Sequence, residues 1–215
     1  MNVSLYQAAA AMEGNLLRQQ TIAENLAAVS VPGYKKHDSS FASVSASNFS
    51  NTLNQASKTQ LQFLIPAFKQ VTNFQQGTLT PTGVDTDIAI EGPGFFQVQG
   101  PKGQVMYTRS GNFRPNADGV LATMDGYPLM GVNGTIRVNP EISDPVTISS
   151  SGDVSQGGVA LGKLGMVTFD DLAALKPLSG GYFGAGTLTP QTIDMTKTSL
   201  RQGYLEGSNT TPMYE

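Results

Sequence analysis

The first 29 residues constrain the fold most, because they contain no proline and only one glycine, Gly14. Apolar or small residues recur along them at alternating intervals of four and three residues, apart from a gap that contains Asn15 and Gln19. The members of this stripe are Met1, Leu5, Ala8, Met12, Ile22, Leu26 and Val29. Such spacing keeps side chains on one face of a helix and is typical of a coiled-coil seam. Pro32 and Gly33 then end the pattern, since proline cannot continue the helical hydrogen bonds and glycine permits a turn. The sequence therefore predicts an amphipathic helix over residues 1–30.

The composition is that of a globular chain with few charges. Hydrophobic residues make up 39% of the 215 residues, which is enough for a core. Charged residues make up 13%, about half of the roughly 25% found in ordinary soluble domains. The 24 glycines and 12 prolines predict many tight turns. The net charge of −3 provides no basic field, so we expect no nucleic-acid partner.

No residue pattern indicates catalysis or metal binding. The chain has no cysteine and a single histidine, His37, which leaves neither a thiolate site nor a zinc cluster. Residues 37–40, His-Asp-Ser-Ser, contain the residue types of a hydrolytic triad, but sequence neighbours do not present the required geometry. The aspartates at 85, 87, 118 and 125 follow no calcium-loop pattern, and Asp before Gly is ordinary turn chemistry. We therefore expect no enzyme activity, cofactor, metal ion or small-molecule substrate.

The sequence carries no pattern of a cleaved signal or of a membrane span. Its first basic residue is Arg18, and no continuous apolar core follows the start, so the N-terminus does not read as a secretory signal peptide. No run of about 18 apolar residues exists, and we expect no direct membrane insertion. The sequence thus predicts a chain that stays in the cytoplasm or leaves it without a cleaved signal peptide.

Beyond the helix, the sequence predicts a linker and then an all-β domain. Residues 31–80 are rich in Ser, Asn, Gln and Thr and fit no single period, so we expect extended or loosely ordered chain with one short strand near residues 68–74. Between residues 81 and 205, short apolar runs alternate with turn signals such as Asp118-Gly119, Asp125-Gly126 and Asn133-Gly134. Strands at this spacing, without intervening helices, favour an antiparallel sandwich or a barrel-like domain.

The end of the predicted helix resembles the N-terminal signature of bacterial flagellar rod and hook proteins. In that family the helix runs into a motif similar to Ala-Asn-Asn-Leu-Ala-Asn-x-x-Thr-Pro-Gly-Tyr-Lys. The matching residues here include Asn25, Pro32, Gly33 and Tyr34. Glu24, Ala28 and Val31 depart from the pattern, because they stand in place of two asparagines and a threonine.

Two further stretches carry the same resemblance. Residues 87–98, 107–113 and 118–128 are similar to the β-domain of flagellar basal-body rod proteins of the FlgG and FlgF types, and residues 202–209 to the run that precedes their C-terminal helix. The matching residues include Gly94, Phe95, Phe96, Tyr107, Arg109, Gly126, Gly207, Ser208 and Asn209. The chain is therefore identified as a member of the flagellar hook–basal body family. The motifs do not separate the distal from the proximal rod type.

The resemblance implies a structural subunit of the flagellar rod, which crosses the periplasm as a drive shaft. Such subunits leave the cell through the flagellar type III export apparatus and polymerise helically with identical copies and with other rod and hook proteins. The residues expected at helix–helix contacts are Leu5, Ala8, Met12, Ile22, Leu26 and Val29. The alternative is a monomeric β-rich binding or adaptor module of the export system or the cell surface.

The resemblance also implies a second helix after the Gly-Ser-Asn run, paired with the first. Residues 206–215 are expected to be only the start of that segment, which leaves the stripe of residues 1–29 without an intramolecular partner. An isolated amphipathic helix is marginally stable, because packing supplies most helical stability. We therefore expect neighbouring chains or the β-domain to order the helix.

Overall fold

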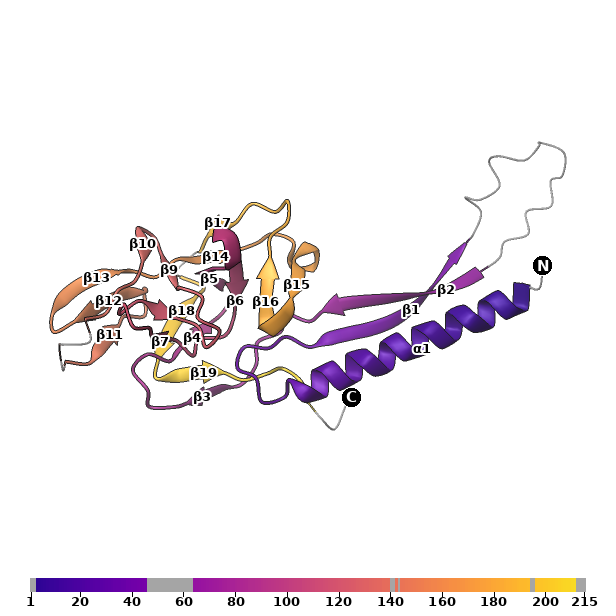
Figure 1. The fold of residues 1–215 in the computed structure, drawn as a ribbon, viewed down its shortest axis with the longest axis horizontal. Coiled ribbons are helices and arrows are strands. Elements are labelled where there is room, and N and C mark those ends of the chain that lie inside the picture. The colour runs from indigo at the N-terminus through magenta and orange to yellow at the C-terminus, as the bar shows by residue number, and fades with distance from the viewer. Residues whose placement is uncertain (1–2, 46–63, 140–141, 143, 194–195, 212–215) are drawn as a thin grey trace.

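The computed structural model describes residues 3–45, 64–139, 142, 144–193 and 196–211. These residues contain one α-helix, α1 (Val3–Ala27), followed by antiparallel strands, and none of the described sheets closes into a barrel. Figure 1 shows two parts, an arm and a β body. The arm consists of α1 with the strands β1 (His37–Ser45) and β2 (Leu64–Thr72), and the β body contains the remaining strands. The prediction of a mainly β fold with a long N-terminal helix is confirmed, and Met1 of the predicted stripe lies outside the described residues.

The β body is built from small antiparallel sheets around one larger sheet. The larger sheet has the order β15 (Lys176–Leu178), β16 (Tyr182–Gly184), β6 (Val105–Thr108), β5 (Phe95–Gln99), β14 (Met166–Thr168) and β17 (Gln191–Thr192). A three-stranded sheet contains β11 (Val146–Ile148), β12 (Asp153–Gln156) and β13 (Val159–Lys163). The two-stranded pairs are β3 (Leu79–Pro81) with β19 (Tyr204–Glu206), β4 (Ile88–Glu91) with β18 (Ser199–Gln202), β7 (Arg114–Pro115) with β8 (Leu121–Ala122), and β9 (Met130–Gly131) with β10 (Gly134–Thr135). Residues 207–211 follow β19 without forming a helix.

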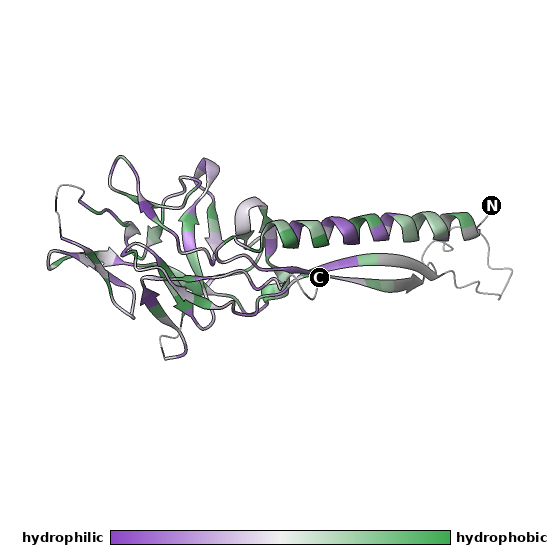
Figure 2. Cartoon of the chain, turned by 90° about the horizontal axis from the view of Figure 1, so that it is seen from below, coloured by the Kyte–Doolittle hydropathy of each residue, from purple (hydrophilic) through white to green (hydrophobic). Residues whose placement is uncertain are grey.

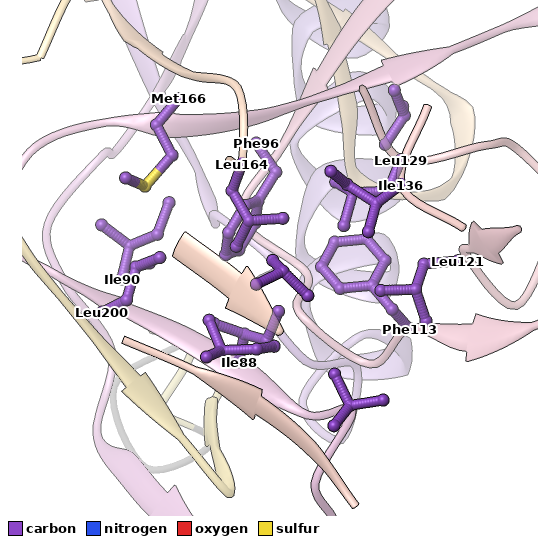
Figure 3. Close-up of a cluster of buried hydrophobic side chains, with 14 of the residues drawn as sticks. Ile88, Ile90, Phe96, Phe113, Leu121, Leu129, Ile136, Leu164, Met166 and Leu200 are labelled. Carbon is purple, nitrogen blue, oxygen red and sulfur yellow. The ribbon is translucent and has the colours of Figure 1, made fainter. Parts of the chain in front are cut away.

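The core of the β body lies between these sheets. Figure 3 shows aliphatic side chains of strands far apart in the sequence converging on two aromatic rings, Phe96 and Phe113. Both rings are fully buried, and they meet edge to face with their centroids 5.2 Å apart. A second buried cluster, beside the first, is mainly aromatic and consists of Phe95, Tyr107, Val167, Phe169, Leu175 and Phe183. The predicted turn at Asp125-Gly126 is present, with Gly126 in the left-handed region at φ 85°, where a side chain would be strained.

The linker differs from the prediction, because much of it forms a long hairpin. β1 and β2 pair antiparallel over nine residues each, from His37 opposite Thr72 to Ser45 opposite Leu64. Sequence periodicity does not reveal this pairing, since β1 is mostly polar, β2 does not alternate strictly between apolar and polar residues, and backbone hydrogen bonds hold each strand to a distant partner. A two-stranded ribbon is marginally stable alone, and here α1 packs along it. Residues 46–63 of the predicted linker lie outside the described residues.

Truncation of Phe113 to alanine should destabilise the β body by about 3–5 kcal/mol, because it leaves a cavity between closely packed sheets. The measurement is the free energy of unfolding from a urea titration. The control is Met124→Ala, since Met124 is 68% exposed and its truncation should change stability by less than about 0.5 kcal/mol. Equal effects of the two substitutions would show that the cluster in Figure 3 is not the core.

Candidate assembly surface

The face of α1 that packs on the hairpin is made of small and polar residues. Gly14, Thr21 and Asn25 are its buried positions, at spacings of seven and four residues. At Gly14 an added Cβ would lie 2.5 Å from Cε1 of Phe41, so the missing side chain makes room for the ring of β1. The hydroxyl of Thr21 donates to the carbonyl of Leu17 at 2.9 Å and is thereby satisfied on this face. The helix therefore uses close approach, not its large apolar side chains, to contact its own chain.

The opposite face of α1 exposes its large apolar side chains. The exposed fractions are 67% for Leu5, 71% for Met12, 67% for Leu16 and 55% for Leu26. At about 100° per residue, Leu5, Met12 and Leu16 point away from the face that contains Gly14. Figure 2 shows hydrophobic residues along the whole length of α1. The described residues thus leave an apolar stripe on the arm without an intramolecular partner. We call Leu5, Met12, Leu16 and Leu26 the exposed stripe.

The structure places the predicted interface residues on two parts of the helix surface. Ala8 is exposed beside Leu5 and Met12, whereas Ile22 and Val29 are half-buried. Val29 also follows the end of α1 at Ala27. Leu16 was absent from the prediction, although its spacing of four residues from Met12 is a signal for the same face.

The side chain of Asn25 joins the C-terminal part of α1 to the hairpin. Its side-chain amide donates to the carbonyl of His37 at 2.9 Å, and its amide oxygen accepts from the backbone N–H of His37 at 2.9 Å. The hydroxyl of Tyr34 also donates to this oxygen at 3.3 Å. These contacts make one side chain the partner of both backbone groups at the first residue of β1. Substitution by a hydrophobic residue would leave those buried groups unpaired.

Asn209 performs a similar role from the other end of the chain. Its amide oxygen accepts from the backbone N–H of Lys36 at 2.7 Å, and its amide nitrogen donates to the carbonyl of Asn73 at 2.8 Å and of Gln75 at 3.1 Å. Lys36 precedes β1 and Asn73 follows β2, so one side chain holds both ends of the hairpin. The segment after β19 is therefore part of the joint between the arm and the β body.

A buried carboxylate, that of Glu206, occupies the centre of this joint. It accepts a hydrogen bond from Lys35 Nζ at 2.5 Å and from the backbone N–H of Gly77 at 2.9 Å, and Arg109 Nε lies 3.4 Å from its other oxygen. Lys35 Nζ also donates to the carbonyl of Gln75 at 2.6 Å. Lys35 and Glu206 have fully buried side chains. We call Lys35, Arg109 and Glu206 the ion cluster.

Burial governs the protonation of the two cations of the cluster. Loss of hydration lowers the pKa of Lys35, and the neighbouring Glu206 opposes this effect. Burial also lowers the pKa of Arg109, again against the attraction of Glu206. Each cation therefore depends on a single anion, because the cluster contains two positive groups and one negative group.

The Pro32-Gly33 turn brings the chain against this cluster. The backbone N–H of Gly33 donates to the carbonyl of Glu206 at 2.7 Å. Gly33 has φ 69°, and an added Cβ would lie 2.3 Å from the backbone nitrogen of Ser110. Both the left-handed conformation and the close approach require glycine here. Pro32, half-buried, precedes it in the turn.

The remaining motif residues have structural positions. Gly207 donates its backbone N–H to the carbonyl of Thr78 at 2.8 Å, and the hydroxyl of Ser208 accepts from the backbone N–H of Thr210 at 3.2 Å. Phe95, Phe96 and Tyr107 lie in the two buried clusters of the β body. Gly94 has φ 138°, and its absent side chain leaves room for Ile193.

The candidate catalytic groups are engaged in structural contacts. His37 Nδ1 lies 3.1 Å from the hydroxyl of Thr72, and Asp38 accepts from the side chain of Asn73 at 3.0 Å. Asp125 accepts from the hydroxyl of Tyr182 at 2.7 Å. Among the described residues, no group of three or more His, Cys, Asp or Glu side chains is placed to hold a metal ion. Within the same part of the chain, no helix has the length and hydropathy that a membrane crossing requires.

Comparison with known proteins gives one consistent family. A family model described as the flagellar hook protein FlgE/F/G D1 domain matches residues 89–156. The chain is 41% identical over 145 residues to the flagellar basal-body rod protein FlgF of Caulobacter vibrioides, an overlap of 66% of this chain and 58% of that relative, so it spans less than two thirds of this relative. It is 31% identical over 223 residues to the flagellar basal-body rod protein FlgG of Agrobacterium fabrum, which covers 94% of this chain and 83% of that protein. The flagellar hook protein FlgE of Rhizobium meliloti is 34% identical over 58% of this chain and 29% of its own length.

Glu206→Gln should destabilise the protein by about 3–5 kcal/mol, because it leaves the buried Lys35 and Arg109 without their anion. Urea unfolding measures this loss, and limited proteolysis near residues 25–37 measures detachment of the arm. The matched control is Glu91→Gln, since Glu91 pairs with Arg201 on an exposed surface and should contribute far less. Equal losses for the two variants would contradict a central role of the ion cluster.

Proposed function

The chain belongs to the family of flagellar basal-body rod and hook proteins, and from this membership we propose that it is a rod subunit that polymerises helically. In this proposal the arm and the β body both contact neighbouring subunits, and the polymer forms the drive shaft that crosses the periplasm. Contacts between unlike surfaces that do not close into a ring generate such an open helical assembly.

The exposed stripe on α1 is the observation that supports this proposal most directly. Leu5, Met12, Leu16 and Leu26 lie on a helix whose other face is already occupied by the hairpin. A row of exposed apolar side chains on a helix is typical of an interface, since burial of apolar surface is favourable by about 25 cal/mol per Å². The spacings of seven and four residues between Leu5, Met12 and Leu16 suit a helix of another subunit.

The joint explains how the stripe would be presented in a repeating assembly. Every subunit of a helical polymer must direct its arm at the same angle to its β body. Asn25, Asn209 and the ion cluster connect α1, the hairpin and β19 through buried polar contacts. Because such contacts require defined geometry, they restrict the arm to one orientation.

The location and the partners of the chain follow from the same proposal. We expect it in the flagellar basal body, after passage through the flagellar type III export apparatus without a cleaved signal peptide. Its partners are identical subunits and other rod and hook proteins, in keeping with the names of its relatives. The role is structural and requires no catalytic group.

Leu26→Asp should abolish self-assembly and leave the thermal unfolding of the β body nearly unchanged. Leu26 is more than half exposed, so a carboxylate there is tolerated in the monomer but would be desolvated at a helix–helix contact. Sedimentation velocity at increasing protein concentration measures assembly, and circular dichroism measures unfolding.

The matched control is Glu13→Gln, which also changes the charge by one unit at an exposed position of α1. It should assemble as the wild type does. A wild-type protein that remains monomeric at all concentrations would instead favour a binding module. Loss of the β-body transition in Leu26→Asp would show that the helix belongs to the core of the body.

A further inference from the structure

The guanidinium of Arg109 is buried with part of its hydrogen-bonding capacity unused. Its side chain is 5% exposed. One terminal nitrogen donates to the carbonyl of Gly92 at 2.8 Å, and Nε faces Glu206. The other terminal nitrogen, Nη1, is buried and has no hydrogen-bond partner in the described part of the chain, and Oε2 of the adjacent Glu206 is likewise buried without a hydrogen-bond partner. Since an unsatisfied buried donor beside a charge is costly, this nitrogen marks a position where a further acceptor would be stabilising.

The local charge also calls for an acceptor that is negative. Lys35 and Arg109 share one carboxylate, that of Glu206, and Lys35 takes its closer oxygen contact. The distance of 3.4 Å from Arg109 Nε to Glu206 is longer than a strong charged hydrogen bond of about 2.7–2.9 Å. Burial lowers the pKa of Arg109, which agrees with an incompletely compensated cation. A second carboxylate would balance the ion cluster.

A cavity of about 230 Å³ adjoins this guanidinium. Arg109 is one of its lining residues, and Phe74, Phe95 and Leu172 form apolar walls, with Gly92 at the rim. The carbon of the guanidinium lies 5.8 Å from the centre of the Phe95 ring. The volume is below the roughly 300–1,000 Å³ of typical small-molecule sites and suits a single side chain. Apolar walls strengthen an ion pair inside such a cavity by lowering the local dielectric constant.

We propose that this cavity receives the carboxylate of an Asp or Glu side chain from a second copy of the chain, which pairs with Arg109. Guanidinium and carboxylate are matched in charge and in geometry, because two N–H groups can meet two oxygens. The chain itself supplies such groups in excess, with 16 acidic residues against 13 basic ones. The second-copy source rests on the proposed polymerisation, while the carboxylate site is a property of the single chain. The residues of the exposed stripe take no part in it.

Leu172 provides a test from inside the cavity. Leu172→Glu places a carboxylate among the residues that line the cavity together with Arg109, and Leu172→Gln is the uncharged control of the same shape. Asp170 and Asp171 precede this position, so a glutamate that fails to reach Arg109 is repelled and lowers the melting temperature relative to glutamine. We expect the melting temperature of Leu172→Glu to exceed that of Leu172→Gln by about 4 °C at pH 7. A glutamate variant that melts at or below the glutamine variant would overturn the site.

Acetate provides an independent probe of the wild-type protein. When sodium acetate replaces sodium chloride at constant ionic strength, the NMR chemical shift of the Arg109 Nε–H group should change and then reach a plateau. The exposed Arg201, paired with Glu91, is the control within the same spectrum and should not follow this curve. Absence of a saturable shift at Arg109 would show that Nη1 is satisfied by water and would overturn the proposal.

The assembly rate tests whether a second copy of the chain supplies the carboxylate. If a second copy supplies it, Leu172→Glu should polymerise several-fold more slowly than Leu172→Gln, because its cavity is already filled. Equal assembly rates, together with acetate binding, would reject the second-copy source. These outcomes are separate from the effect of Leu26→Asp, which tests polymerisation through the exposed stripe and does not involve the cavity.

Discussion

The structure depends on the burial of one carboxylate, that of Glu206, between Lys35 and Arg109. Lys35 follows the turn after α1, Arg109 follows β6, and Glu206 is the last residue of β19. Their contact therefore joins segments that are distant in the sequence. Removal of charges from water is costly, and the cost is offset only when each group is paired and hydrogen-bonded. The backbone N–H of Gly77 donates to Glu206 Oε1 and the carbonyl of Gln75 accepts from Lys35 Nζ, whereas Glu206 Oε2 and Arg109 Nη1 have no hydrogen-bond partner among the described residues. The arm is therefore held to the β body by contacts that tolerate little change in geometry.

The polar joint supplements the small contact between α1 and the hairpin. The helix packs on the hairpin through Gly14, Thr21 and Asn25, which offer close approach and hydrogen bonds but bury little apolar area. The hydrogen bonds and the ion pair of the joint hold α1 and the hairpin to the β body, which this small contact alone does not do. The large side chains of the exposed stripe remain exposed, and in the proposed polymer they would contact another chain. Under the proposed function, stability of the single chain and assembly would therefore use different faces of the same helix.

The candidate site could be predicted from the sequence only in part. Resemblance to a known family identified Asn25, Gly33 and Asn209 as motif residues, but their roles became evident only from the contacts between them. The predicted stripe omits Leu16, because it follows alternating intervals of four and three residues and treats the stretch that contains Asn15 and Gln19 as a gap. The hairpin was missed for a different reason. Neither strand alternates strictly between apolar and polar residues, and each strand pairs with a segment many residues away, so local periodicity does not indicate their pairing.

The long helix, the all-β character of the body and the family could be predicted from the sequence, because periodicity, turn dipeptides and motifs are local properties of the chain. The sequence also predicted that the helix carries an apolar stripe. The folded structure was needed to show which face of the helix packs on its own chain, and that Lys35, Arg109 and Glu206 share one buried site. The reason is physical. Burial and ion pairing depend on distances between residues far apart in the sequence, and these distances are set when the β body and the arm fold against each other.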